Sequence, residues 1–328
     1  MNLSIYVNTP IRKPSSIPAK QNSCPMAETG TKFNSSSIPF TGFYLRKDIF
    51  DYTIKSQSRL MLGTRIYREP FLWKELPKYL ENRFANMKNV NIIQGACSVG
   101  LETRAIESTM SEQLGSKFLD KYHIIASDPD ETSVALAKSN LMCFSHKDKD
   151  IHWNEEAGIT DFSKYFTQLE GEEKNEKLES YFNLMTDGKI RNIELDKVNG
   201  EIIQTEPANH DKTLSKRVID LVYKVSDDLT KNTTFEKAYI QDVLKSKGKN
   251  APCVVVLRNA ACCFNKKDRG KLAEDIYNNI AKGSVLIIGD CDLTMYRNSP
   301  WSADLIEKGF TRNSNVENTA GYYIFEKN

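Results

Sequence analysis

The segment that decides the fold is Ile92–Glu102, with the sequence IIQGACSVGLE, together with IIASDPD at residues 124–130. In the first, an apolar run ends at Gly95, turns through small residues and enters a helical pattern. Small residues let the backbone approach a ligand closely, and a helix N-terminus offers free amide hydrogens. In nucleotide-binding α/β folds, a carboxylate that ends the second strand accepts hydrogen bonds from ribose hydroxyls, and Asp128 occupies such a position. The two segments together predict a nucleoside site.

The spacing of the glycines narrows the class of nucleoside. Gly95 and Gly100 form GxxxxG, so the GxGxxG motif of dinucleotide sites is absent, and no Lys followed by Ser or Thr makes a phosphate loop. A nucleoside whose phosphates need not be bound, such as S-adenosylmethionine, fits this pattern. A strand-to-helix turn that serves only as a tight connection is the other interpretation.

Outward from these segments, apolar strand patterns alternate with helical ones. A helical stripe runs from Phe71 to Phe84, where Pro77 indicates a kink or a late helix start. Further helical patterns pass through Leu101–Leu114 and Val134–Leu141. The apolar strand patterns are Val90–Ile93, Tyr122–Ala126, Val218–Val225, Cys253–Leu257, Val285–Ile288 and Tyr322–Phe325. This rhythm predicts an α/β fold with a doubly wound, largely parallel, seven-stranded Rossmann-like sheet.

The chain divides into two parts. Residues 1–40 are rich in Ser, Pro, Asn and Thr and predict a flexible arm, whereas residues 41–328 predict one domain. Residues 145–212 interrupt the alternation, and twelve acidic against six basic residues lie between Asp150 and Gly200. We interpret 145–212 as a solvated insertion, with a cap over the site as the second interpretation.

Composition excludes several classes of function. The 328 residues carry 45 Lys and Arg against 43 Asp and Glu, a net charge of +2, which gives no uniform field for binding nucleic acid or a membrane surface. The apolar runs are far shorter than the roughly 20 residues of a membrane helix, and no Sec signal peptide is recognisable. Seven Cys without a CxxC pair predict reduced thiols, and four His without ligand spacing predict no metal site. We therefore expect a cytoplasmic protein, with secretion by another route left open.

Five segments, in order, resemble the CheR-type methyltransferases, which methylate glutamates of chemotaxis receptors. TRIYREP (64–70) resembles their TxFFR segment, ACSVGLE (96–102) their GCSTGEE turn and ASDPD (126–130) their SDID strand end. CVVVLRN (253–259), followed by Phe264, is similar to CRNVLIYF, and residues 282–289 are similar to the family's KPGGxLxxGHSE strand.

This resemblance implies roles for individual residues. Glu102 would meet the amino group of the methionine moiety, and Asp128 would meet the ribose hydroxyls. The backbone near Asp228 and Leu229 would border the adenine. Arg258 and Asn259 would lie beside the methionine portion. The remaining residues implied at the cofactor are Thr64, Gly95, Ala96, Cys97, Ser98 and Gly100.

The activity implied is methyl transfer from S-adenosylmethionine, with S-adenosylhomocysteine as product, to a protein acceptor such as a side-chain carboxylate. Arg68 would align that carboxylate, which is already ionised at neutral pH and needs no general base. The family pattern is not kept at Leu101, Thr103, Arg104 and Cys263, and its N-terminal helical domain has no counterpart in residues 1–40. Two alternatives therefore stay open: a cofactor-binding protein without transfer activity, and a small-molecule methyltransferase.

Overall fold

The structure is a computed structural model, and it describes seven stretches of the chain. These are residues 66–145, 154–187, 193–207, 214–261, 264–293, 300–313 and 319–328. The expected arm at residues 1–40 and the candidate cofactor residue Thr64 lie outside the described residues.

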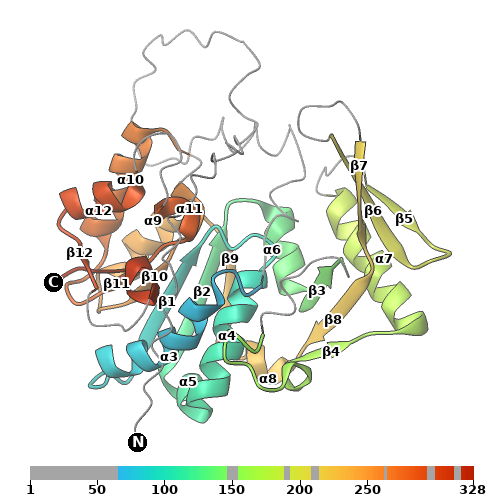
Figure 1. The fold of residues 1–328 in the computed structure, drawn as a ribbon, viewed down its shortest axis with the longest axis horizontal. Coiled ribbons are helices and arrows are strands. Elements are labelled where there is room, and N and C mark those ends of the chain that lie inside the picture. The colour runs from blue at the N-terminus through green and yellow to red at the C-terminus, as the bar shows by residue number, and fades with distance from the viewer. Residues whose placement is uncertain are drawn as a thin grey trace, which may run out of the picture.

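A seven-stranded, mostly parallel sheet forms the centre (Figure 1). β13 pairs antiparallel with both of its neighbours, and all other pairings in this sheet are parallel. Numbered along the chain, the strands lie in the order 3-2-1-4-5-7-6, so the connections change direction between β1 and β10. Ligands of open α/β sheets bind at the carboxyl ends of the strands beside such a switch point. From edge to edge the strands are β9 (Thr233–Lys237), β2 (Tyr122–Asp128), β1 (Val90–Gly95), β10 (Val254–Val256), β11 (Val285–Ile287), β13 (Ile324–Glu326) and β12 (Thr311–Arg312).

Helices flank this sheet because alternate strand residues enter two separate hydrophobic clusters. Ile92 and Ile124 pack in one cluster with residues of α3 and α4, whereas Ile93 and Ile125 pack in the other with residues of α9, α10 and α12. Burial on both faces explains the continuous apolar runs in the sequence. The helices are α3 (Pro70–Arg83), α4 (Leu101–Leu114), α5 (Ser116–Lys121), α6 (Glu131–Lys138), α7 (Gly171–Asp187), α8 (Asp227–Thr230), α9 (Ile240–Val243), α10 (Lys266–Asn279), α11 (Asp290–Leu293) and α12 (Trp301–Glu307).

Helix α3 begins at Pro70, before the late start at Pro77 that was one of our two expectations. Pro70 occupies its first turn, where the missing amide hydrogen has no intrahelical partner to lose. The helix continues through Pro77, so a late start is wrong. Its buried stripe of Leu72, Trp73 and Leu76 packs in the first cluster, as the spacing predicted.

The segment between α6 and β9 builds two small antiparallel sheets, which stand to the right of the central sheet in Figure 1. One has the order β3 (Leu141–Phe144), β8 (Leu221–Val225) and β4 (Phe166–Gln168); the other is β5 (Ile193–Asp196), β6 (Glu201–Pro207) and β7 (Leu214–Ile219).

Two expectations about this region are wrong. Residues 218–225 do not return to the central sheet, since they divide between β7 and β8, and Leu141 begins a strand instead of extending a helix. The third central strand is β9, whose sequence TTFEK is polar at four of five positions because it lies at a sheet edge with only β2 as a partner. The apolar strand β8 therefore belongs to a small sheet, whereas the polar strand β9 belongs to the central sheet.

We predict opposite effects of alanine at two glycines. A Cβ atom on Gly95 would come within 2.5 Å of Ile240 Cδ1, so Gly95→Ala should destabilise the protein by about 1–3 kcal/mol. Gly270 lies inside α10 with open space around it, so Gly270→Ala should stabilise by roughly 0.4–1 kcal/mol. Urea unfolding midpoints measure both. If Gly95→Ala unfolds at the same urea concentration as wild type, the close packing of Ile240 against Gly95 at the end of β1 is wrong.

Candidate functional site

The loop that follows β1 is strained and fixed. Ala96 and Ser98 both have φ 53°, a left-handed conformation that residues with a Cβ atom adopt at a cost, and Gly100 has φ 86°. The amide of Cys97 donates to the carbonyl of Ser127, 3.0 Å away, which ties the loop to β2. Ala96 is exposed, but the side chain of Cys97 is buried, so Cys97 could meet a ligand only through its backbone.

Asp128 joins the loops that follow β1 and β2. Its carboxylate accepts the amide of Ser98 at 3.0 Å and that of Asp130 at 2.9 Å. Burial raises its pKa to about 6, although the two amide hydrogen bonds act in the opposite direction. Each carboxylate oxygen keeps further lone pairs. Asp128 is therefore held in the position expected of a ribose ligand at the end of the second strand.

Glu102 lies in the first turn of α4 and is oriented from β1. Thr103 Oγ1 donates to Gln94 Oε1 at 2.7 Å, and Gln94 Nε2 donates to Glu102 Oε2 at 3.1 Å. Burial raises the pKa of Glu102 to about 7, since desolvation outweighs the nearby positive charge of Arg68. Gln94 is a site residue that we did not predict; its signal was a polar side chain at the end of an otherwise apolar strand.

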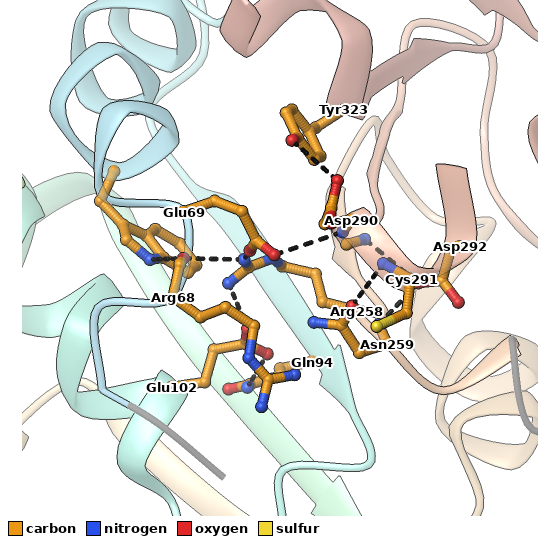
Figure 2. A network of polar contacts seen from close by, with 12 residues as sticks. Arg68, Glu69, Gln94, Glu102, Arg258, Asn259, Asp290, Cys291, Asp292 and Tyr323 are labelled. Carbon is orange, nitrogen blue, oxygen red and sulfur yellow. Dashed lines mark hydrogen bonds and ion pairs between the residues drawn. The ribbon is translucent and has the colours of Figure 1, made fainter. Parts of the chain in front are cut away.

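Arg258 follows β10 and is completely buried (Figure 2). One of its terminal nitrogens donates to Glu102, and the other donates to the carbonyl of Arg68 at 2.9 Å and forms an ion pair with Glu69. Its guanidinium carbon lies 4.5 Å from the ring centroid of Trp73. Burial lowers the pKa of Arg258 to about 9, and the charge of Arg68 acts in the same direction. Since its side chain has no exposed surface, Arg258 could act on a ligand only through Glu102 and not by direct contact.

Asn259 and Asp292 cross-link the loops after β10 and β11. Asn259 has φ 54°, and its amide donates to Asp292 Oδ2 at 2.6 Å, an oxygen that also accepts the amide of Gly289 at 3.1 Å. In return, Asn259 Oδ1 accepts the amide of Cys291 at 2.9 Å. Asp292 is 1% exposed and was not predicted. The available signal was an acidic residue three positions after the glycine that ends an apolar strand.

Arg68 completes the group from the segment before α3. Its side chain extends toward Glu102 and Gln94 (Figure 2), and it is close enough to Glu102 to lower the pKa of that carboxyl group. Its carbonyl is fixed twice, by Arg258 and by Trp73 Nε1 at 2.9 Å. The structure therefore brings Arg68 to the same edge of the sheet as the predicted cofactor residues.

Asp228 and Leu229 do not belong to this group, which corrects their expected place beside an adenine. They lie in α8, which leads into the start of β9, whereas the other candidates follow the ends of strands. Asp228 is exposed and pairs with Lys231, and Leu229 is buried in the core. The loop that does follow β9 begins with Ala238, whose amide donates to the carbonyl of Asp128 at 3.1 Å. The misplacement follows from not recognising β9.

The charges in this cluster do not cancel. Among the described residues, the guanidinium groups of Arg68 and Arg258 lie near the carboxyl groups of Glu69, Glu102 and Asp292, so two positive charges oppose three negative ones when all are ionised. Asp290, at the start of α11, is exposed and therefore solvated. The cluster lacks one positive charge, and a proton on Glu102 supplies it near neutral pH. A cationic ligand group could take the place of that proton.

Comparisons with known proteins supply no family. No protein-family model matches the sequence, and no curated protein gives a significant match. Within the described ranges, no helix has both the length and the apolar character needed to cross a membrane. In the same part of the chain, no three His, Cys, Asp or Glu side chains are grouped so that they could hold a metal ion.

We predict that Glu102 gives the free energy of unfolding a distinctive pH dependence. Its pKa is about 7 in the folded protein against a usual 4.5, so between these values the folded state holds a proton that the unfolded chain has released. Stability therefore falls as pH rises through this window, by up to about 3 kcal/mol. Burial is the main cause of this raised pKa; among the charged groups, Arg68 lowers it and Asp292 raises it, and Arg258 faces the same carboxyl group.

Urea unfolding of wild type and Glu102→Gln at pH 5 and pH 8 measures this effect. The amide cannot ionise, so Glu102→Gln should lose less stability than wild type between the two pH values. The similar contribution of Asp128 is present in both proteins and cancels. Equal losses would show that Glu102 is already ionised at pH 5.

Proposed function

We propose that this chain is an S-adenosylmethionine-dependent methyltransferase. The observation that carries the proposal is the hydrogen bond from the Ser98 amide to Asp128, which joins the small-residue loop after the first strand to the carboxylate that ends the second. The pair lies beside the switch point of the sheet, where nucleosides bind in open α/β folds. The order 3-2-1-4-5 of the five parallel strands is that of doubly wound nucleotide-binding sheets, which supports the same proposal.

The charge of the site favours this cofactor over an uncharged nucleoside. The ribose hydroxyls would donate to Asp128, and the adenine would lie near Ala238 and Tyr239, which follow β9 and are half-buried. The ammonium group of the methionine moiety would then approach Glu102 and supply the positive charge that the cluster lacks. Each end of the cofactor thereby meets a carboxylate that is already oriented by hydrogen bonds.

The acceptor would enter beside Arg68, and we propose a protein acceptor, with a side-chain carboxylate as the first choice. Transfer is an in-line displacement at the methyl carbon, so the protein contributes chiefly by holding the two reactants in line. An arginine can align a carboxylate through two parallel hydrogen bonds. A small-molecule acceptor, and binding without transfer, remain the alternatives.

Asp128→Ala tests the cofactor half of the proposal. Ribose hydroxyls left unpaired in a partly buried site should weaken binding of S-adenosylhomocysteine by about 1–3 kcal/mol, or roughly 5- to 150-fold. The matched control is Asp130→Ala. Asp130 caps α6 by accepting the amide of Ser133 at 2.8 Å, so its loss should cost about 1 kcal/mol of stability and leave affinity within about twofold. Calorimetric titration that gives one affinity for wild type and Asp128→Ala would contradict the ribose assignment.

Arg68→Ala tests the acceptor half. With a carboxylate acceptor, this variant should lose turnover while its affinity for S-adenosylhomocysteine stays within about twofold, because alignment is required only for transfer. Arg68→Lys keeps the charge but loses the paired donors, so it should stay impaired. Both are compared with wild type at pH 8, where Glu102 is ionised. Transfer by Arg68→Ala at the wild-type rate would rule out the carboxylate mechanism.

A further inference from the structure

Arg258 connects the cofactor side of the site to the acceptor side. On one side it donates to Glu102, at the start of α4. On the other it donates to the carbonyl of Arg68 and pairs with Glu69, in the segment that leads into α3. These contacts join residues that are 156 and 190 positions apart in the chain. A single buried cation therefore serves two carboxylates and the backbone of the arginine expected to meet the acceptor.

The segment that carries Arg68 depends on this cation. Glu69 has φ 52°, a left-handed conformation that persists only where neighbouring contacts impose it. Those contacts are the ion pair with Arg258 and a hydrogen bond of 3.3 Å from the Asp290 amide to Glu69 Oε1. Trp73 adds a second donor to the Arg68 carbonyl, and its indole ring lies against the guanidinium of Arg258. If the contacts of Arg258 with Glu102 weaken and those with Glu69 strengthen, the position of Arg68 would therefore change, because Arg258 also holds the Arg68 carbonyl.

We propose that Arg258 is a positioning residue that transmits occupancy of the cofactor site to Arg68. At pH 8, where Glu102 is already ionised before binding, the ammonium group of a bound cofactor shares the carboxylate of Glu102, which weakens the attraction between Glu102 and Arg258. Arg258 then interacts more strongly with Glu69 and with the Arg68 carbonyl, and this fixes the acceptor-side segment. The inference rests on the proposed function, because it requires a cofactor with a cationic group at Glu102.

Trp73 gives a readout that needs no acceptor. Its indole contacts Arg258 and donates to the Arg68 carbonyl, so a shift in these groups alters the surroundings of a fully buried tryptophan. Titration with S-adenosylhomocysteine should change the tryptophan emission with the same midpoint as the calorimetric titration. Because the chain has 3 Trp, Trp73→Phe identifies the part of the change that comes from Trp73.

The deciding variant is Glu69→Gln, which removes the distant carboxylate and leaves Arg258, Glu102 and Asp128 in place. We expect an emission change reduced at least twofold at saturating S-adenosylhomocysteine, with a weaker affinity than wild type, because a contact that strengthens on binding must itself favour binding. Arg258→Met should remove the emission change altogether, and Glu69→Gln still decides the question if that variant does not fold. The matched control is Glu81→Gln, another glutamate of the α3 region, which pairs with Lys121 at 3.1 Å and should leave both quantities unchanged.

The results separate this inference from the proposed function. Binding of S-adenosylhomocysteine with the same emission change in wild type and Glu69→Gln would overturn the positioning role of Arg258 and leave the proposed function intact. Binding with no contribution from Trp73 would do the same. Absence of any binding heat in wild type would overturn the proposed function, and the inference with it.

Discussion

A buried guanidinium must be neutralised where it lies, and this requirement organises the carboxyl edge of the sheet. Arg258 has no exposed side-chain surface, its pKa of about 9 leaves it ionised near neutral pH, and the carboxyl groups of Glu69 and Glu102 face it from two sides. Removing either carboxylate leaves a buried charge without full compensation, which is far more costly than the loss of a surface pair. The end of β10, the start of α4 and the segment before α3 are therefore held together by one side chain.

The same requirement gives the site its electrostatic character. In the part of the chain that the structure describes, and with Asp292 included, the carboxylates of this cluster outnumber the arginines by one, and Glu102 retains a proton at pH values where an exposed glutamate would be ionised. A site in this state favours a ligand that brings one positive charge close to Glu102. This preference follows from charge and burial alone, and it agrees with the ammonium group of the cofactor that we propose.

The sequence was sufficient for much of the fold but for less of the site. Strands β1, β2, β10 and β11 were predictable because strands buried on both faces are almost uniformly apolar. β9 was not predictable, since an edge strand such as TTFEK carries no such signal. Because β9 was missed, the adenine contacts were expected at Asp228 and Leu229, which lie where β9 begins and not where it ends. Local patterns were enough to select Gly95 and Asp128 as candidate site residues, because each is recognised by its place at the end of its own strand.

Contacts between distant segments could not be predicted from local patterns. Arg258 was expected near the methionine portion of a cofactor, but its burial between Glu69 and Glu102 depends on how the start of α3, with Trp73, meets the residue after β10 and the start of α4. Gln94 and Asp292 were missed because neither belongs to a recognisable motif; each acts by orienting a candidate residue, Glu102 in one case and Asn259 in the other. Sequence patterns therefore predict well which loops form the site. They predict less well which side chains hold those loops together.

The central claim is that a bound cofactor's ammonium replaces a proton on Glu102, and the number of protons released on binding tests it most directly. Calorimetric titration with S-adenosylhomocysteine at pH 6, in buffers of different ionisation enthalpy, gives this number. Because the pKa of Glu102 is about 7, wild type should release about one proton more than Glu102→Gln at pH 6, and the difference should vanish near pH 8.5. Equal proton release by the two proteins at pH 6 would contradict the account.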